Sequence, residues 1–106
     1  KGLERSILIS DAAAPAGLPP GRGRSLGNDV LIQADGKLVN PTTGYLVGSS
    51  CTLRQIVNAT RRGLGLSDDE IATLAVRNPA RLIGLTVPPQ LPDLPRSADG
   101  DYLPPD

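Results

Sequence analysis

The pattern of apolar and polar positions divides the chain into a strand-forming half and a helical half. Residues 6–10 are a short, continuously apolar run, which is typical of a strand buried on both faces of a parallel sheet. Residues 15–23 hold three prolines and three glycines and predict a loop. Strands are expected at residues 29–34 and 37–40, because the Asp35-Gly36 pair between them favours a hairpin turn.

The first helix is predicted over residues 50–62. Leu53, Ile56 and Val57 have the spacing of one apolar helix face, and Gly63 is expected to end the helix. This helix follows the predicted loop at residues 41–48.

Two further helices are predicted by their N-terminal signals. Ser67 and Glu70 have the spacing of a capping box, so a helix should begin directly after Ser67. Asn78-Pro79 predicts a third, short helix with Asn as its cap and Pro as its first residue. Arg81 is expected to tie that helix to neighbouring carbonyl groups.

The last part of the chain differs in composition. Six prolines fall within residues 86–106, a density that interrupts helices and central strands. We therefore expect a domain over residues 1–85 and a Pro-rich tail over residues 86–106, with a short strand near Tyr102. Tyr45 and Tyr102 are the chain's two aromatic residues, which predicts a small core.

Composition excludes several classes of function. Eleven basic residues balance eleven acidic ones, so the chain lacks the basic surface of a nucleic-acid binder. Its longest apolar runs are far shorter than the ~20 residues that cross a membrane. One cysteine, Cys51, agrees with a cytoplasmic protein. The absence of histidine excludes a Ser-His-Asp triad or a His-based metal site within this chain alone.

Asp11 is the candidate for acid–base chemistry, because it is a single carboxylate at the end of the apolar run. It could equally bond backbone N–H groups in a turn or remain solvated. Arg22 and Arg24, between glycines, are a candidate anion site or a solvated turn. Cys51 is a candidate nucleophile, although a packing role needs no missing base.

Three segments carry a family resemblance when they are taken in order: ILISDAAAPAGLPPG, GYLVGSSCTLRQIVN and GLSDDEIATLAVRNPARLIGL. Together they resemble the C-terminal third of the N-acetylglucosamine-6-phosphate deacetylases of the amidohydrolase superfamily, over about residues 6–85. The resemblance implies an α/β fold: a C-terminal piece of a (β/α)8 TIM barrel. That piece would contain the last barrel strand at residues 6–10, the hairpin, two to three helices and a remnant of the flanking β-sandwich.

The resemblance also implies a function. The family belongs to amino sugar metabolism and hydrolyses the acetamide of N-acetylglucosamine 6-phosphate with a divalent metal, commonly zinc. Asp11 would be the catalytic aspartate, at the C-terminal end of a barrel strand, where it takes a proton from metal-bound water and gives it to the leaving amine. Leu46, Val47 and Gly48 would contact the substrate.

The chain also departs from the family. A barrel takes about 250 residues, and the family's metal-binding histidines have no counterpart here. We therefore expect no metal bound by this chain alone, no activity in isolation, and either a homo-oligomer or association with the missing part of the barrel. The alternative is a non-catalytic module stabilised by self-association or by a partner chain.

Overall fold

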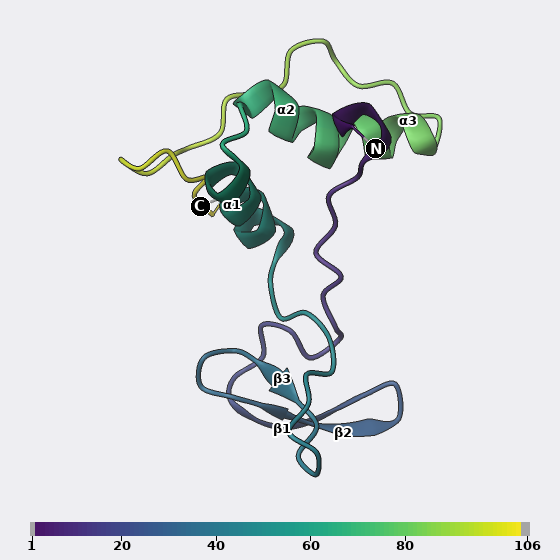
Figure 1. Ribbon diagram of the computed structural model, residues 1–106, viewed down its shortest axis with the longest axis vertical. Helices are drawn as coiled ribbons and strands as arrows, with labels where there is room; N and C mark the ends of the chain where they lie inside the picture. The colour runs from purple at the N-terminus through teal and green to yellow at the C-terminus, as the bar shows by residue number, and fades with distance from the viewer. Residues whose placement is uncertain (1, 105–106) are drawn as a thin grey trace. The chain divides into compact units, whose positions relative to one another are not determined.

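The computed structural model describes residues 2–104 (Figure 1), and it contains two compact units. The sheet unit holds residues 10–52, and the helical unit holds the residues up to 9 and from 53 onward. In chain order the elements are η1 (Leu3–Arg5), β1 (Gly21–Ser25), β2 (Asn28–Ile32), β3 (Leu38–Val39), α1 (Leu53–Leu64), α2 (Asp68–Ala72), the π-helix η2 (Thr73–Arg77) and α3 (Asn78–Leu82). The chain is thus a small α/β structure with a three-stranded sheet.

The sheet is antiparallel, in the order β1-β2-β3. The predicted hairpin is confirmed, because Ile32 pairs with Leu38 across the Asp35-Gly36 turn. The loop predicted at residues 15–23 is wrong at its end, where Gly21–Ser25 forms β1. Its glycines and arginines have little strand preference, so it is pairing with β2 that makes this segment a strand.

The core of the sheet unit lies on one side of this sheet. Val30, Ile32 and Leu38 are buried together, and Ala13, Ala16 and Val47 pack against them. Val30 and Ile32 alternate along β2, as expected for a strand with one buried face.

Helix α1 begins at Leu53 and continues through Gly63 to Leu64, so the predicted end at Gly63 is wrong. The Leu66 N–H donates to the Arg61 carbonyl (3.1 Å), which satisfies one of the carbonyls at the end of the helix. The helix buries Val57, as predicted, and also Asn58.

The predicted capping box at Ser67 is confirmed, with both of its reciprocal hydrogen bonds to Glu70. The predicted third, short helix is confirmed as α3, which begins at Asn78, but it directly continues the helical structure of α2 and η2. Asn78 itself has helical angles (φ −66°, ψ −45°), so it is not the cap of a new helix.

Residues 6–10 do not form a strand within the described part of the chain. No other described segment pairs with them as a strand, although the Leu8 N–H donates to the Leu74 carbonyl (3.0 Å). A buried strand needs strands on both sides, and residues 2–104 supply none here.

Residues 100–102 of the Pro-rich tail form hydrogen bonds with side chains of α1. Arg96 and Tyr102 form an isolated antiparallel bridge at the place of the expected short strand. The Asn58 side chain accepts from the Tyr102 N–H (2.9 Å) and donates to the Tyr102 carbonyl (3.1 Å). The last two residues of the predicted tail lie outside the described residues. Among the helices that the structure describes, none is long and apolar enough to span a membrane.

Candidate functional site

Asp11 lies in the sheet unit, where its side chain is exposed. Its backbone is left-handed, with φ of 50°. This conformation is uncommon for residues other than glycine, although aspartate tolerates it better than most. Such backbone strain concentrates at functional positions and persists where neighbouring contacts impose it.

The residues after Asp11 supply those contacts. The Ala13 N–H donates to the Ser49 carbonyl (2.9 Å), and Ala12 forms a parallel bridge with Ser49. The Ala12 N–H also faces the Ser10 hydroxyl (3.4 Å), which closes a turn around Asp11. Asp11 is therefore held one residue away from a backbone contact with the segment that follows Gly48.

The predicted substrate-contacting residues join the same sheet. Leu46 forms an antiparallel bridge with Val39, and the Val47 N–H donates to the Leu38 carbonyl (3.0 Å). The Leu46 side chain is exposed (67%), whereas the Val47 side chain packs on the core. Leu46 and Gly48 thus have solvent-facing positions, and Val47 fixes the loop between them.

Gly48 is required by the local geometry. Its φ is +130°, and a Cβ built on it would lie 3.0 Å from the Ala13 Cβ. Any larger residue would push apart the two segments that hold Asp11 beside the loop. The sequence contains no signal for this contact, because it depends on two segments that are distant in the chain.

The other candidates have structural partners. Arg24 donates to the Gly27 carbonyl (2.8 Å) and lies 3.8 Å from the Asp29 carboxylate, so it braces the β1–β2 turn. The Cys51 thiol is half-buried, and the Cys51 N–H donates to the Ser49 hydroxyl (3.2 Å). Neither residue lies in a cluster with a catalytic base.

No family model matches the chain. An N-acetylgalactosamine-6-phosphate deacetylase of Escherichia coli O157:H7 is 34% identical to it over 82 residues, which are 77% of this chain and 21% of that relative. The solved N-acetylglucosamine-6-phosphate deacetylases of Thermotoga maritima (27% identical, TM-score 0.70) and Mycobacterium smegmatis (36%, TM-score 0.64) each match 79% of this chain and 23% of their own. The chain is similar in sequence and in structure to a part of the N-acetylamino sugar 6-phosphate deacetylases.

The chain spans only a part of these deacetylases. A second relative, from E. coli K12 and provisionally assigned the galactosamine activity, is also 34% identical over 82 residues, which make up 48% of its length. The chain therefore covers about half of the shorter curated relative and about a fifth of the longer one.

The described residues do not fit the metal site that the resemblance to the deacetylases implies. Within residues 2–104 no three His, Cys, Asp or Glu side chains come together as metal ligands. Asp11 is thus the single candidate ligand or base that this segment brings to the loop at residues 46–48.

Proposed function

We propose that this chain is the C-terminal part of the TIM barrel of a deacetylase that hydrolyses an N-acetylamino sugar 6-phosphate. The observation that carries the proposal is the Ala12–Ser49 bridge, which holds the Asp11 turn against the segment after Gly48. Sequence similarity to the deacetylases, at 34–36% identity over more than three-quarters of the chain, supports it. Relatives are named for both the galactosamine and the glucosamine sugar, so the proposal covers this class of substrate.

In this proposal Asp11 moves the proton of the reaction. Water adds to the acetamide carbonyl, the carbon–nitrogen bond breaks, and acetate and the free amino sugar phosphate leave. The Asp11 carboxylate accepts a proton from the attacking water and returns it to the departing nitrogen. Leu46 and Gly48 contact the sugar, because they are the solvent-facing positions of the neighbouring loop.

The remaining components lie outside the described residues. Residues beyond this segment hold the divalent metal, which we expect to be zinc, since this segment has no suitable cluster. We therefore propose that the isolated chain is inactive, that its partner is the rest of the barrel, and that the assembly is cytoplasmic.

A chimera tests this proposal. The segment of the M. smegmatis deacetylase that matches this chain is replaced by residues 6–85, and hydrolysis of N-acetylglucosamine 6-phosphate is measured. We expect turnover in the chimera, and a fall in kcat of about 10²–10⁴ in Asp11→Asn with little change in KM. Asp29→Asn, an exposed acid of the same unit, should keep the parental kcat. Equal kcat in Asp11→Asn and Asp29→Asn would contradict the assignment.

A second candidate is a non-catalytic module stabilised by association. Ile7 and Ile9 are 40% and 65% exposed next to backbone that pairs with no strand in the described residues. Unpaired strand edges of this kind favour pairing between chains. Sedimentation analysis separates the candidates: a concentration-dependent dimer of the 106-residue chain supports the module, and a monomer at all concentrations contradicts it.

A further inference from the structure

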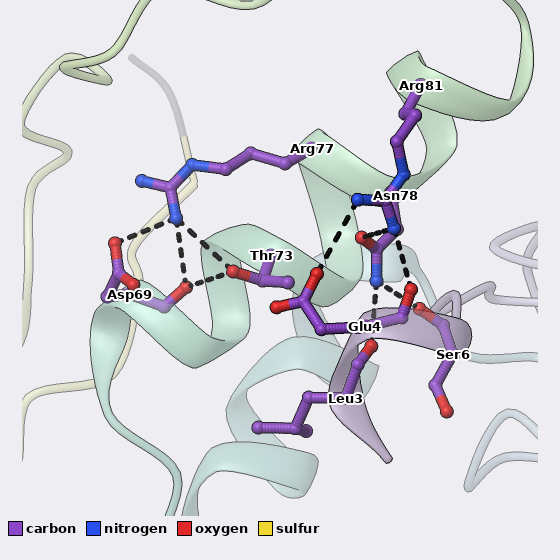
Figure 2. Close-up of polar contacts among 8 residues, drawn as sticks. All are labelled: Leu3, Glu4, Ser6, Asp69, Thr73, Arg77, Asn78 and Arg81. Carbon is purple, nitrogen blue, oxygen red and sulfur yellow. Dashed lines mark hydrogen bonds and ion pairs between the residues drawn. The ribbon is translucent and has the colours of Figure 1, made fainter. Parts of the chain in front are cut away.

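Two buried asparagines of the helical unit each bind the backbone of a distant segment. Asn78, which is 4% exposed, donates through Nδ2 to the carbonyl oxygens of Leu3 (2.8 Å) and Ser6 (2.7 Å), as Figure 2 shows. Arg81 donates to the Glu4 carbonyl (2.6 Å) and to Asn78 Oδ1 (2.8 Å), so both ends of this amide have partners. The prediction that Arg81 ties its helix to neighbouring carbonyls is therefore confirmed.

The second buried asparagine, Asn58 on α1, binds the Pro-rich tail. It is 6% exposed, and its Oδ1 accepts from the Tyr102 N–H (2.9 Å) while its Nδ2 donates to the Tyr102 carbonyl (3.1 Å). Arg54 Nη1 donates to the same carbonyl (3.3 Å). The Asn58 amide thus pairs with one residue in the way that two opposite residues of an antiparallel sheet pair. These bonds use only backbone atoms of the tail, so they hold an extended segment whatever its side chain.

Two arginines of α1 make the contact selective for residues 100 and 101. Arg61 Nη2 donates to the Gly100 carbonyl (2.5 Å), and the Arg62 guanidinium binds the Asp101 carboxylate. Gly100 has φ of +80°, and a Cβ built on it would overlap the end of the Arg61 side chain. A larger residue would therefore strain its own backbone and push Arg61 away from the carbonyl that it binds. The helix thus recognises a glycine that is followed by an acidic residue.

The charges of the two segments are complementary. Helix α1 contains three arginines and no acidic residue, whereas residues 86–106 contain four acidic residues and one arginine. Opposite charge increases the rate at which two surfaces meet and disfavours partners of the wrong sign. A ligand of this helix face should accordingly be acidic.

The part of the tail that α1 binds has a fold of its own. Arg96 and Tyr102 form an antiparallel bridge, and the Ser97 N–H between them donates to the Asp101 carbonyl (2.9 Å). The Arg96 guanidinium lies 4.1 Å from the centre of the Tyr102 ring and donates to its hydroxyl (2.8 Å). Residues 96–102, which we call the tail hairpin, are therefore held largely by their own contacts, and such preorganisation lowers the cost of binding.

The contact between the tail hairpin and α1 is incompletely paired. Arg61 Nε and Asp101 Oδ1 are buried without a hydrogen-bond partner among the described residues. A buried polar atom without a partner weakens a contact, because it has lost its bond to water. Residues 86–94, which connect the hairpin to the helices, also form no hydrogen bond in the described part of the chain. These features favour a tail hairpin that can leave its place on α1.

We propose that α1 carries a peptide-binding site for acidic hairpins with a Gly-Asp pair, and that the tail hairpin of the same chain is its occupant in this structure. Asn58 binds the backbone of the ligand, Arg61 selects the glycine, and Arg62 selects the acid. The site accepts the same hairpin from a separate molecule once its own tail is released. The site lies wholly in the helical unit, so it is independent of the proposed deacetylase function.

Binding of a separate peptide tests the site by NMR on the full ¹⁵N-labelled chain. Gly100→Val should release the chain's own tail, because valine does not tolerate the left-handed backbone and would displace Arg61. A peptide of residues 95–104 with the parental sequence should then bind α1 and return its amide shifts towards the parental values. In the parent the same peptide should bind more weakly by about tenfold or more, because the tethered tail has a high effective concentration.

Variants of the peptide provide the matched controls. Asp101→Asn and Asp99→Asn remove the same charge, but Arg62 binds Asp101, whereas Asp99 is exposed. We expect Asp101→Asn to weaken binding about three- to fivefold and Asp99→Asn to bind as the parental peptide does.

Cleavage of the connecting residues covers the case in which the Gly100→Val chain does not fold. A protease site is placed within residues 87–91, and the chain is cut after it has folded with its own tail in place. The cut tail should stay on α1 at high concentration and leave on dilution. Asn58→Ala should raise the concentration at which it leaves by about tenfold, because two hydrogen bonds to the tail are lost.

The outcomes decide between a peptide-binding site and a tail that is held only by its tether. Binding of the parental peptide to the Gly100→Val chain, or retention of the cut tail at high concentration, supports the site. A cut tail that leaves α1 at every concentration, or a released α1 that ignores the peptide, overturns it. Equal weakening by Asp99→Asn and Asp101→Asn would show that charge alone attracts the tail and would overturn the selectivity. An inactive chimera counts against the proposed function and leaves these results as they are.

Discussion

Gly48→Ala should weaken the sheet unit more than any other glycine-to-alanine change with comparable backbone angles. At φ +130° an alanine backbone is strained, at a cost of about 1–3 kcal/mol. The new Cβ would also lie 3.0 Å from the Ala13 Cβ, and overpacking of this kind costs about 1–3 kcal/mol. The sum is about 2–6 kcal/mol, a large share of the ~5–15 kcal/mol that stabilises a typical domain.

Gly36→Ala is the control in the same unit. Its φ of +84° is also left-handed, but nothing lies within 4 Å of a built Cβ. It should therefore have the backbone cost alone, about 1–2 kcal/mol. The assay is urea unfolding followed by NMR peaks of β2, so that the sheet unit is measured separately from the helical unit.

The two variants also differ in their local effect. Gly48→Ala should accelerate amide exchange of Ala13, whose N–H donates to Ser49, whereas Gly36→Ala should leave it protected. If both variants have the same free energy of unfolding and the same Ala13 exchange, the close approach at Gly48 does not hold the Asp11 turn.

Three further changes test the remaining contacts. Ser67→Ala should lower stability by about 1 kcal/mol in thermal unfolding, because it removes the capping box. Asn58→Ala should cost about 1–3 kcal/mol and expose Tyr102 to proteolysis, because both backbone partners of Asn58 lie there. Lys37 donates to Asp35 (2.6 Å) and lowers the pKa of its carboxyl. This contact is present above the ordinary pKa of Asp35 and disappears as pH falls through the lowered value, so the protection factors of the hairpin amides should fall in acid in the parent but not in Asp35→Asn.

Each of these changes has a control of the same residue type. The control for Ser67 is Ser25→Ala, which should leave helix capping unchanged, and the control for Asn58 is Asn28→Ala, which should leave the tail contacts unchanged. Asp29→Asn should leave the acid response unchanged. All three control residues lie in the sheet unit, away from the contacts that are tested. A Ser67→Ala variant as stable as Ser25→Ala would show that the cap contributes nothing. If Tyr102 stays protected from proteolysis in Asn58→Ala, the Asn58 contact does not hold the tail. If Asp35→Asn still loses hairpin protection in acid, the contact between Lys37 and Asp35 is not the cause of that loss.

Local signals in the sequence predicted the elements whose causes are local. The capping box at Ser67 and the hairpin around Asp35-Gly36 need only nearby residues, and both are confirmed. Strand β1 was not predictable, because its residues become a strand only through pairing with β2. The apolar run at residues 6–10 has the composition of a buried strand, but composition does not supply the neighbours that a sheet requires.

The candidate site also combines features that the sequence predicted with contacts that it did not. Asp11 and the loop at residues 46–48 were nominated by resemblance to a family, and their roles stay predictions. Their proximity arises from the Ala12–Ser49 bridge, a contact between distant segments that periodicity does not reveal. Asn78 was assigned to a helix cap from its own neighbours, yet its partners, Leu3 and Ser6, lie at the other end of the chain.

Pro79 is the cause of a local change in the hydrogen bonding of the helical run, and this change provides a contact with the extended segment at Leu8. A proline inside an α-helix removes one hydrogen bond and clashes with the preceding turn, at a cost of about 3 kcal/mol. The π-helical segment avoids part of that cost by moving the Asn78 hydrogen bond to Thr73. The same shift leaves the Leu74 carbonyl without a helical partner, and a buried carbonyl needs one. The Leu8 N–H donates to this carbonyl, so the proline that weakens the helix also makes a contact between the helix and the N-terminal segment possible.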